Sequence, residues 1–274
     1  MNEIGLIREG LETGRFIPYL GPGVLDLVPN CPVPNSPNSL VEKLVSKVSV
    51  PHKVRKNLTA AAQFIENFKH RKSLSGIMTE TFAPQVEPSP LHHYLAHLPC
   101  GPALIVDVWY DNAMQGAMSP GGDWGQVHGV SQSEHFGTWV HYYQSLGDVA
   151  EADQAVNWRK LIYKPLGSIS PGNNFLVSDT DFVEVMTEID IQTPIPDAVK
   201  RIRTGKNFIF MGCRFRNQLE RTFARQIMKR SALRHWAVLP GEMTRNEERF
   251  LKEQGIERLD ISLGDFVREL IVET

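Results

Sequence analysis

Residues 16–23 read FIPYLGPG, a short apolar run that leads directly into two glycines. A run this short and this continuously apolar is typical of a strand covered on both faces of a parallel sheet. Three further strong runs and two weaker ones share the pattern: residues 103–108, 207–211 and 235–239, then 161–163 and 256–259. The sequence therefore predicts a sheet in which the first run is one of several buried strands.

Stretches with helical periodicity separate these runs. They are residues 2–13, 39–48, 57–70, 91–98, 181–189, 217–230 and 244–254. Strands that alternate with helices indicate an α/β fold, a Rossmann-like, doubly wound parallel sheet with helices on both faces.

Prolines and glycines predict loops at 28–39, 83–90 and 119–129. None of these loops coincides with a change in composition. We therefore expect a single domain over residues 1–274, with an inserted segment at about 119–160.

The composition excludes several classes of protein. The chain has 29 Lys and Arg against 31 Asp and Glu, a net charge of −2, which argues against nucleic-acid binding as the main task. It has no apolar stretch long enough to cross a membrane and no signal-peptide pattern at its start. Its three cysteines, Cys31, Cys100 and Cys213, form no Cys-x-x-Cys pair, so we expect no disulfide framework, no zinc subdomain and a cytoplasmic location.

Ligands of doubly wound sheets bind at the carboxyl ends of the strands. Gly21, Pro22 and Gly23 follow the first strand, where glycines let the backbone turn tightly and approach a pyrophosphate. An ordinary turn explains the same residues equally well, and Pro22 removes one N–H donor.

A second glycine, Gly212, follows the strand at 207–211 and precedes Cys213 and Arg214. Asn217 then fits the N-cap of a helix, so this turn has the composition of an anion site. Basic residues further along that helix fit a solvated face better than a site.

Five segments, in the same order along the chain, resemble motifs of the SIR2-like domain family, the zinc-free relatives of sirtuins. They are RFIPYLGPGV (15–24), LIVDVWYD (104–111), IYKPLGS (162–168), FIFMGCRFRN (208–217) and the ending 248–270. The first four are similar, in turn, to the family's Gly-Ala-Gly-[Ile/Val]-Ser, Thr-Thr-Asn-Tyr-Asp, Tyr-Lys-Leu-His-Gly-Ser and Gly-Tyr-Ser-[Leu/Phe]-Arg-Asp motifs. The resemblance covers nearly the whole chain.

The resemblance implies a fold that holds NAD or an ADP-ribose-type nucleotide, without a metal. Active members cleave the nicotinamide–ribose bond, and many are bacterial defence proteins that degrade NAD. The residues that the resemblance places around such a nucleotide are Gly21, Pro22, Gly23, Asp26, Trp109, Asp111, Gly167, Ser168, Gly212, Cys213 and Arg214. For Asp26 and Asp111, a position in a surface loop explains the residue at least as well.

The family's catalytic positions carry other residues in this chain. Trp109 stands at the family's Asn and Leu166 at its His, and neither side chain can orient water or exchange a proton. Leu25 and Arg214 replace two serines. We therefore predict that the usual NAD cleavage is lost, with Trp109 either stacking on a base or blocking the nicotinamide subsite, and Arg214 pairing with a phosphate.

Two groups of histidines suggest other functions, one as replacement catalytic groups and one as zinc ligands. His128, His135 and His141 in the 119–160 segment could replace the lost catalytic groups, although a lid or packed surface insert is the simpler interpretation. His93 and His97 have the spacing of two zinc ligands, but no third ligand is evident, so we expect no metal.

Three hypotheses for the function remain open at this point. The chain is a nucleotide-binding module without NAD cleavage, a hydrolase of NAD or a related nucleotide with a rebuilt site, or an assembly domain without ligand. We expect a small nucleotide and a second copy or protein as partners, and neither nucleic acid nor a membrane.

Overall fold

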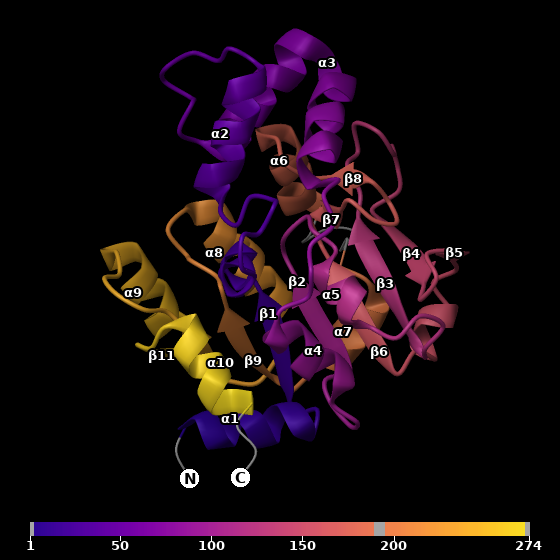
Figure 1. The fold of residues 1–274 in the computed structure, drawn as a ribbon, viewed down its shortest axis with the longest axis vertical. Helices are drawn as coiled ribbons and strands as arrows, with labels where there is room; N and C mark the ends of the chain where they lie inside the picture. The colour runs from indigo at the N-terminus through magenta and orange to yellow at the C-terminus, as the bar shows by residue number, and fades with distance from the viewer. Residues whose placement is uncertain (1–2, 189–194, 272–274) are drawn as a thin grey trace.

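Strand β1 (Phe16–Leu20) lies in the middle of a large, mostly parallel sheet (Figure 1). The computed structural model describes residues 3–188 and 195–271, and within these the sheet has the order β11-β10-β9-β1-β2-β6-β3-β4-β5. Its other strands are β2 (Leu104–Asp107), β3 (Trp124–Gly129), β4 (Val140–Gln144), β5 (Val149–Ala150), β6 (Lys160–Lys164), β9 (Asn207–Met211), β10 (His235–Val238) and β11 (Ile256–Leu259). Only β4 and β5 enter by antiparallel pairs, and β7 (Gly167–Ser168) and β8 (Asn174–Phe175) form a separate small hairpin.

Helices cover both faces of the sheet. One face packs against α1 (Glu3–Glu12), α4 (Pro90–His97), α5 (Ala113–Ala117) and α10 (Leu263–Ile271). The other packs against α6 (Asp179–Glu188), α7 (Asp197–Arg203), α8 (Gln218–Met228) and α9 (Arg245–Glu253). The predicted fold class, a doubly wound α/β sheet, is confirmed.

Two helices stand apart from these layers. Helices α2 (Pro37–Lys47) and α3 (Leu58–Phe82), with the loop between them, form what we call the helical lobe, residues 37–82. Figure 1 places it at one end of the longest axis, opposite α1 and α10. A separate apolar core, which includes Leu40, Phe82 and Trp109, joins the lobe to the sheet.

The strong apolar runs all form strands, and the predicted helices are present with shifts of a few residues at their ends. The helix expected at 57–70 instead extends to Phe82, across a kink at His70, where φ is +68°. Residue 189, the predicted end of another helix, lies outside the described residues.

The loop predicted at 119–129 is partly wrong, because Trp124–Gly129 forms β3, paired with β6. Its glycines mark close packing: a Cβ on Gly125 would lie 2.5 Å from the Trp158 ring, and one on Gly129 would overlap the backbone of Pro165. The segment 119–160 therefore extends the sheet beyond β6. No described helix is long and apolar enough to cross a membrane.

Candidate functional site

The turn after β1 is hydrogen-bonded to the neighbouring turn after β9. Gly21 N–H donates to the Met211 carbonyl at 2.8 Å and Gly23 N–H to the Gly212 carbonyl at 2.9 Å. Val24 N–H donates back to the Gly21 carbonyl at 3.1 Å, where the 3₁₀ helix η1 (Pro22–Leu27) begins. Because Pro22 has no N–H, the donors from Gly21 to Val24 are all engaged within the protein.

Glycine is required where these two turns meet. Gly212 has a φ of +67°, and a Cβ there would overlap the backbone of Gly23 and Val24. A Cβ on Gly21 would lie 2.5 Å from the Gly212 carbonyl oxygen. Gly21 and Gly212, which the resemblance places around one nucleotide, are thus adjacent, but the space between them is filled by backbone.

Cys213 and Gly167 take other surroundings. Cys213 is buried, and burial raises the pKa of its thiol well above the ordinary value. Gly167, with a φ of +79°, packs against the backbone of Asn174 and Gly129 rather than near Gly21. The three glycines therefore do not line one common cavity.

Trp109 is a packed residue of the core, with 4% of its surface exposed. Its indole N–H donates to the Pro34 carbonyl at 2.7 Å, and its ring meets the edge of Phe82 with centroids 5.9 Å apart. The single polar atom of the side chain is thus committed to the loop that follows β1. Trp109 fills the position at which the resemblance placed a catalytic amide.

Leu166 packs against the cores on both sides of the carboxyl end of β6. The Ser168 hydroxyl beside it is fully buried and donates to the carbonyls of Tyr110 and Asp111, at 3.2 and 3.1 Å. The Asp111 carboxylate is buried and accepts from Ala113 N–H at 2.9 Å, which starts α5. Asp111 and Ser168 therefore hold the backbone together, and neither lines the two cavities described below.

A buried ion pair joins the ends of β2 and β6. The Lys164 ammonium lies 2.6 Å from the Asp107 carboxylate and donates to the Asp111 carbonyl at 2.8 Å. Burial raises the pKa of Asp107 to about 6, although the Lys164 charge opposes this shift. His92 is also buried nearby, and burial lowers the pKa of its imidazole to about 4. This polar network is enclosed, so it stabilises the strand ends instead of reaching a substrate.

Arg214 points to α9. Its guanidinium donates to the Glu247 carboxylate at 3.0 and 3.3 Å and to the carbonyls of Pro240 and Glu242 at 3.1 and 2.9 Å. Burial acts to raise the pKa of Glu247, but hydrogen bonds from Thr244, Arg214 and the backbone hold it below its ordinary value. The structure gives Arg214 a partner within the protein, and its pairing with a phosphate stays a prediction.

An open cleft of about 430 Å³ lies between η1 and the start of α2. Its volume is within the range of small-molecule sites, roughly 300–1,000 Å³. The polar groups that line it are Asp26, Asn30, Asn35, Ser39 and Lys43. Of the sequence-predicted residues, only Asp26 belongs to this lining.

Hydrogen bonds order the polar side of this cleft. The Asn35 amide donates to Asp26 at 2.5 Å, and the Ser39 hydroxyl donates to the Asn35 amide oxygen at 3.2 Å. Lys43, one turn further along α2, is exposed. Pro34, which accepts from Trp109, also lines the cleft, so Trp109 braces its wall from behind. Carboxylate and amide groups beside an ammonium can hold a ribose and a phosphate.

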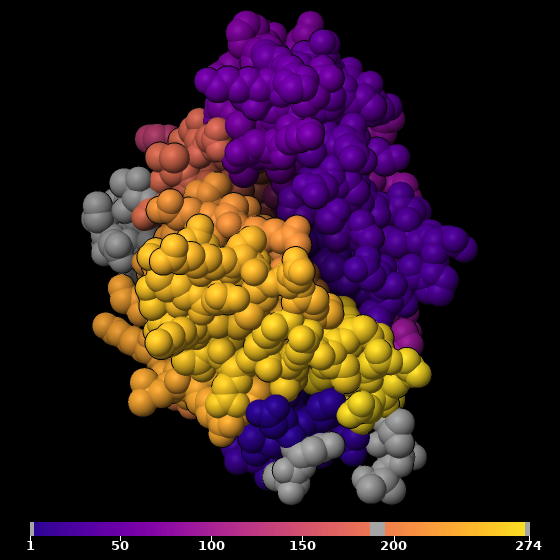
Figure 2. Space-filling model, turned by 90° about the vertical axis from the view of Figure 1, so that its left-hand side faces the viewer, coloured from indigo at the N-terminus to yellow at the C-terminus, as the bar shows by residue number. Residues whose placement is uncertain are grey.

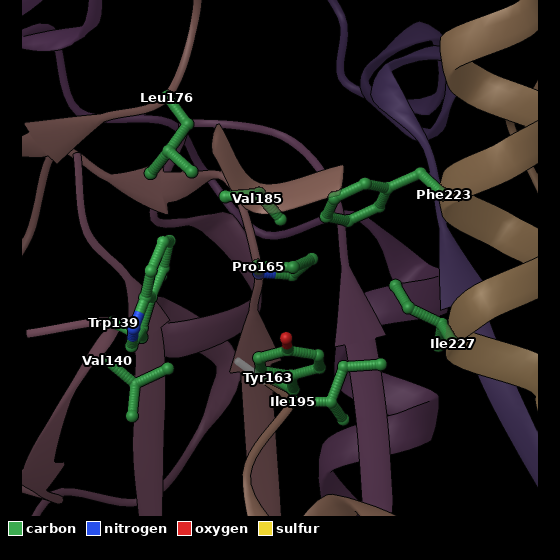
Figure 3. Close-up of a pocket in the computed structure, with 10 residues that line it drawn as sticks. Trp139, Val140, Tyr163, Pro165, Leu176, Val185, Ile195, Phe223 and Ile227 are labelled. Carbon is green, nitrogen blue, oxygen red and sulfur yellow. The ribbon is translucent and has the colours of Figure 1, made fainter. Parts of the chain in front are cut away.

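A second cavity is apolar and only large enough for about one water, at about 10 Å³. Figure 3 shows the Tyr163 hydroxyl among the side chains of Val185, Phe223 and Ile195, on the face that carries α6 and α8. Burial raises the pKa of Tyr163 far above its ordinary value, so the hydroxyl stays protonated. This cavity is too small for a nucleotide.

Of the histidines of the 119–160 segment, His128 lies on β3, His141 lies on β4, and His135 lies in the turn between these strands. His128 is buried, its Nε2 lies 3.0 Å from the Gln126 amide oxygen, and its Nδ1 has no hydrogen-bond partner among the residues that the structure describes. Burial lowers its pKa well below the ordinary value. His135 and His141 lie against each other nearer the surface, with ring centroids 4.9 Å apart. None of the three lines the open cleft.

In the described part of the chain, no group of three or more His, Cys, Asp or Glu side chains could hold a metal ion. His97 Nδ1 instead lies 2.7 Å from the His93 carbonyl, within one helix.

Sequence reasoning did not identify Asn35, Ser39 and Lys43 as site residues. The proline-rich loop and the Ser36–Ser39 capping box were the available signal, because they place a helix start beside the turn after β1.

Comparison with known families places most of the sheet in one of them. Residues 103–259, more than half of the chain, match a family model described as SIR2-like domain. None of the curated proteins matches the chain.

Proposed function

Because the chain belongs to the SIR2-like domain family, we propose that it binds NAD, ADP-ribose or a related nucleotide and does not cleave the nicotinamide–ribose bond. At the level of the family, the match points to NAD-related binding or hydrolysis. We choose binding over hydrolysis because of Trp109, which is buried and whose indole N–H, its only donor, is hydrogen-bonded to the Pro34 carbonyl.

Cleavage of that bond develops positive charge on the ribose and needs a polar group to orient water. Leu166 supplies no such group, and the nearby carboxylates of Asp107 and Asp111 are engaged in buried contacts. These contacts support a domain that retains a ligand without reacting with it.

The open cleft is our proposed binding site for the nucleotide. The Asp26 carboxylate would accept hydrogen bonds from ribose hydroxyls, and the Lys43 ammonium would pair with a phosphate. The engaged donors of the Gly21 turn support this placement, because that turn has no free N–H before Leu25 for a pyrophosphate.

Two measurements on the purified chain test the proposal. Chromatography of NAD incubated with the protein should show no nicotinamide beyond a buffer control. NAD and ADP-ribose should each stabilise the fold, by about 2.7 kcal/mol when the ligand is at 100 times its dissociation constant. Steady release of nicotinamide would overturn the absence of cleavage and favour a hydrolase with a rebuilt site.

Matched variants locate the ligand. Lys43→Gln and Asp26→Asn should each weaken binding about tenfold, because each removes a charged hydrogen bond. Lys47→Gln is the control, since Lys47 lies one turn further along α2, pairs with Glu80 and is absent from the cleft. Equal effects of Lys43→Gln and Lys47→Gln would exclude this cleft as the site.

An assembly domain without ligand is the second candidate. The saturated donors of the Gly21–Val24 turn favour it, because a phosphate site normally presents free N–H groups. No stabilisation by any nucleotide of the panel, together with a concentration-dependent mass in light scattering, would select this candidate.

A further inference from the structure

The charges of this chain are unevenly distributed between its two parts. The helical lobe, residues 37–82, carries eight Lys and Arg against three Glu, a formal charge of +5. The rest of the chain therefore carries 21 basic against 28 acidic side chains, a charge of −7. The net charge of −2 masks this separation, and it therefore does not describe the electrostatic potential at the lobe.

Most of the basic side chains of the lobe face solvent. Lys53, Arg55 and Lys56 are exposed in the loop between α2 and α3, and Lys69 and Lys72 are exposed at the kink of α3. No ion pair is present for these five among the described residues, whereas Lys47 pairs with Glu80 and Arg71 with Asp181. We call Lys53, Arg55 and Lys56 one basic cluster and Lys69 and Lys72 the other. The charges of both clusters are thus available to pair with a partner.

A stacked aromatic pair, of which one ring is exposed and the other partly buried, lies between the two basic clusters along the chain. Phe64 and Phe68, one turn apart on α3, stack with ring centroids 4.3 Å apart, and Phe68 is 67% exposed. The first part of α3, from Leu58 to the kink at His70, spans about 18 Å at 1.5 Å per residue. Basic groups therefore flank an exposed ring from both ends of this helical segment.

We propose that the helical lobe binds single-stranded nucleic acid, with Phe68 stacking on a base and the two basic clusters pairing with the phosphates on either side. Aromatic rings among lysines are the general means by which proteins hold single strands without sequence preference. The two basic clusters and Phe68 do not line the open cleft, although Ser39 and Lys43 of the same lobe do. The proposal replaces the expectation, drawn from net charge, that nucleic acid is not a partner.

Other polyanionic partners fit the surface less well. The exposed residues around the kink are Asn67, Phe68, Lys69, His70 and Lys72, so one ring is apolar among polar neighbours. A membrane surface requires a wider apolar face than this. A duplex hides its bases from a side-chain ring, and an acidic peptide needs the lysines but not Phe68.

The position of the lobe suits an extended ligand. Figure 1 shows the lobe projecting at one end of the molecule, and Figure 2, turned by 90°, shows its violet surface forming that end. The rest of the chain, with its formal charge of −7, lies below the lobe in both views, so a strand would be held at the lobe and repelled by the body.

Fluorescence anisotropy with a labelled 20-nucleotide oligothymidylate and the full chain tests the proposal. We expect binding in 50 mM salt that weakens about 20- to 50-fold in 200 mM salt, as release of counterions at three or four phosphates predicts. The triple variant Lys53→Gln, Lys56→Gln and Lys72→Gln should lower the slope of log K against log salt by about 2.

The matched control removes three exposed charges elsewhere. Arg201→Gln, Arg245→Gln and Lys252→Gln, on α7 and α9, change the net charge equally and should leave binding within twofold. Phe68→Ala and Phe68→Leu should both weaken binding at least fivefold without changing the salt slope, because the ring carries no charge.

Four results would overturn the proposal. They are no binding in 50 mM salt, equal losses in the two triple variants, unchanged affinity of Phe68→Ala, and tighter binding of polyglutamate or of vesicles with anionic lipid than of the oligonucleotide. Thermal unfolding of each variant shows whether it is folded, and the exposed positions predict unchanged midpoints.

Discussion

Replacement of Trp109 by alanine should cost the fold about 3–5 kcal/mol, the usual range for a buried tryptophan. The ring is 4% exposed and contacts Phe82 and Tyr110, with centroids 5.9 and 5.0 Å apart. Its removal leaves a void in the core that joins the helical lobe to the sheet. Urea unfolding followed by far-ultraviolet circular dichroism measures the change in the free energy of unfolding.

A conservative variant separates packing from hydrogen bonding at this position. Trp109→Phe keeps most of the ring but loses the donor to the Pro34 carbonyl, so it should cost only about 1 kcal/mol for the hydrogen bond, plus the smaller ring's lost contacts. A loss below about 1 kcal/mol for Trp109→Ala would refute the view that Trp109 is a packing residue. Equal losses for both variants would assign its whole effect to the hydrogen bond.

The same variants report on ligand binding. Since Pro34 lines the open cleft, Trp109→Ala should weaken nucleotide binding by loosening that wall. Calorimetric titration of ADP-ribose measures the affinity. Tighter binding by Trp109→Ala would instead mean that the indole blocks a subsite, which would contradict the bracing role.

Lys164→Met should lower the free energy of unfolding in urea by about 3–5 kcal/mol, because it leaves the Asp107 carboxylate buried without its cation. Adding Asp107→Asn should recover most of the loss. A loss below about 1 kcal/mol for Lys164→Met would contradict a stabilising role of the ion pair. Gly212→Ala should destabilise by at least about 2 kcal/mol more than Gly241→Ala, since both glycines have positive φ but only Gly212 has backbone in the way of a Cβ; equal costs in thermal unfolding would disprove the contact. His92 is buried with its pKa lowered to about 4 from 6.5, so the folded chain binds its proton less readily than the unfolded chain. The stability that His92 contributes is therefore complete above pH 6.5 and is lost between pH 6.5 and 4, by up to about 3 kcal/mol, and His92→Gln should flatten that part of the pH profile.

The sequence predicts an element of the fold correctly where its local residue pattern matches the burial of that element in the folded chain. The runs at β1 and β9 are apolar because both faces of a central parallel strand are covered, so their composition alone predicts them. The sequence does not predict β3, because Gly125 and Gly129 are typical of loops. Glycine is needed at these positions because Trp158 and Pro165 pack closely against them, a contact that only the folded chain shows.

The candidate site was less predictable than the fold. Asp26 follows the first strand closely and was identified, whereas Lys43 reaches the same cleft from the next helix. The partner of Arg214 is Glu247, 33 residues away, and no local pattern links them. Strand-end positions are predictable from topology, but which of their side chains face solvent depends on contacts from distant segments.

The outer edge of the sheet ends in β5, which has only two residues and pairs antiparallel with β4. An unpaired strand edge is a template on which other chains can add by backbone hydrogen bonds, and its capacity grows with its length. Although Val149 there is 76% exposed, two residues give an incoming chain too little ladder to grip. The short length of β5, together with the acidic Asp148 and Glu151 on either side of it, thus makes this edge a poor template for the addition of another strand.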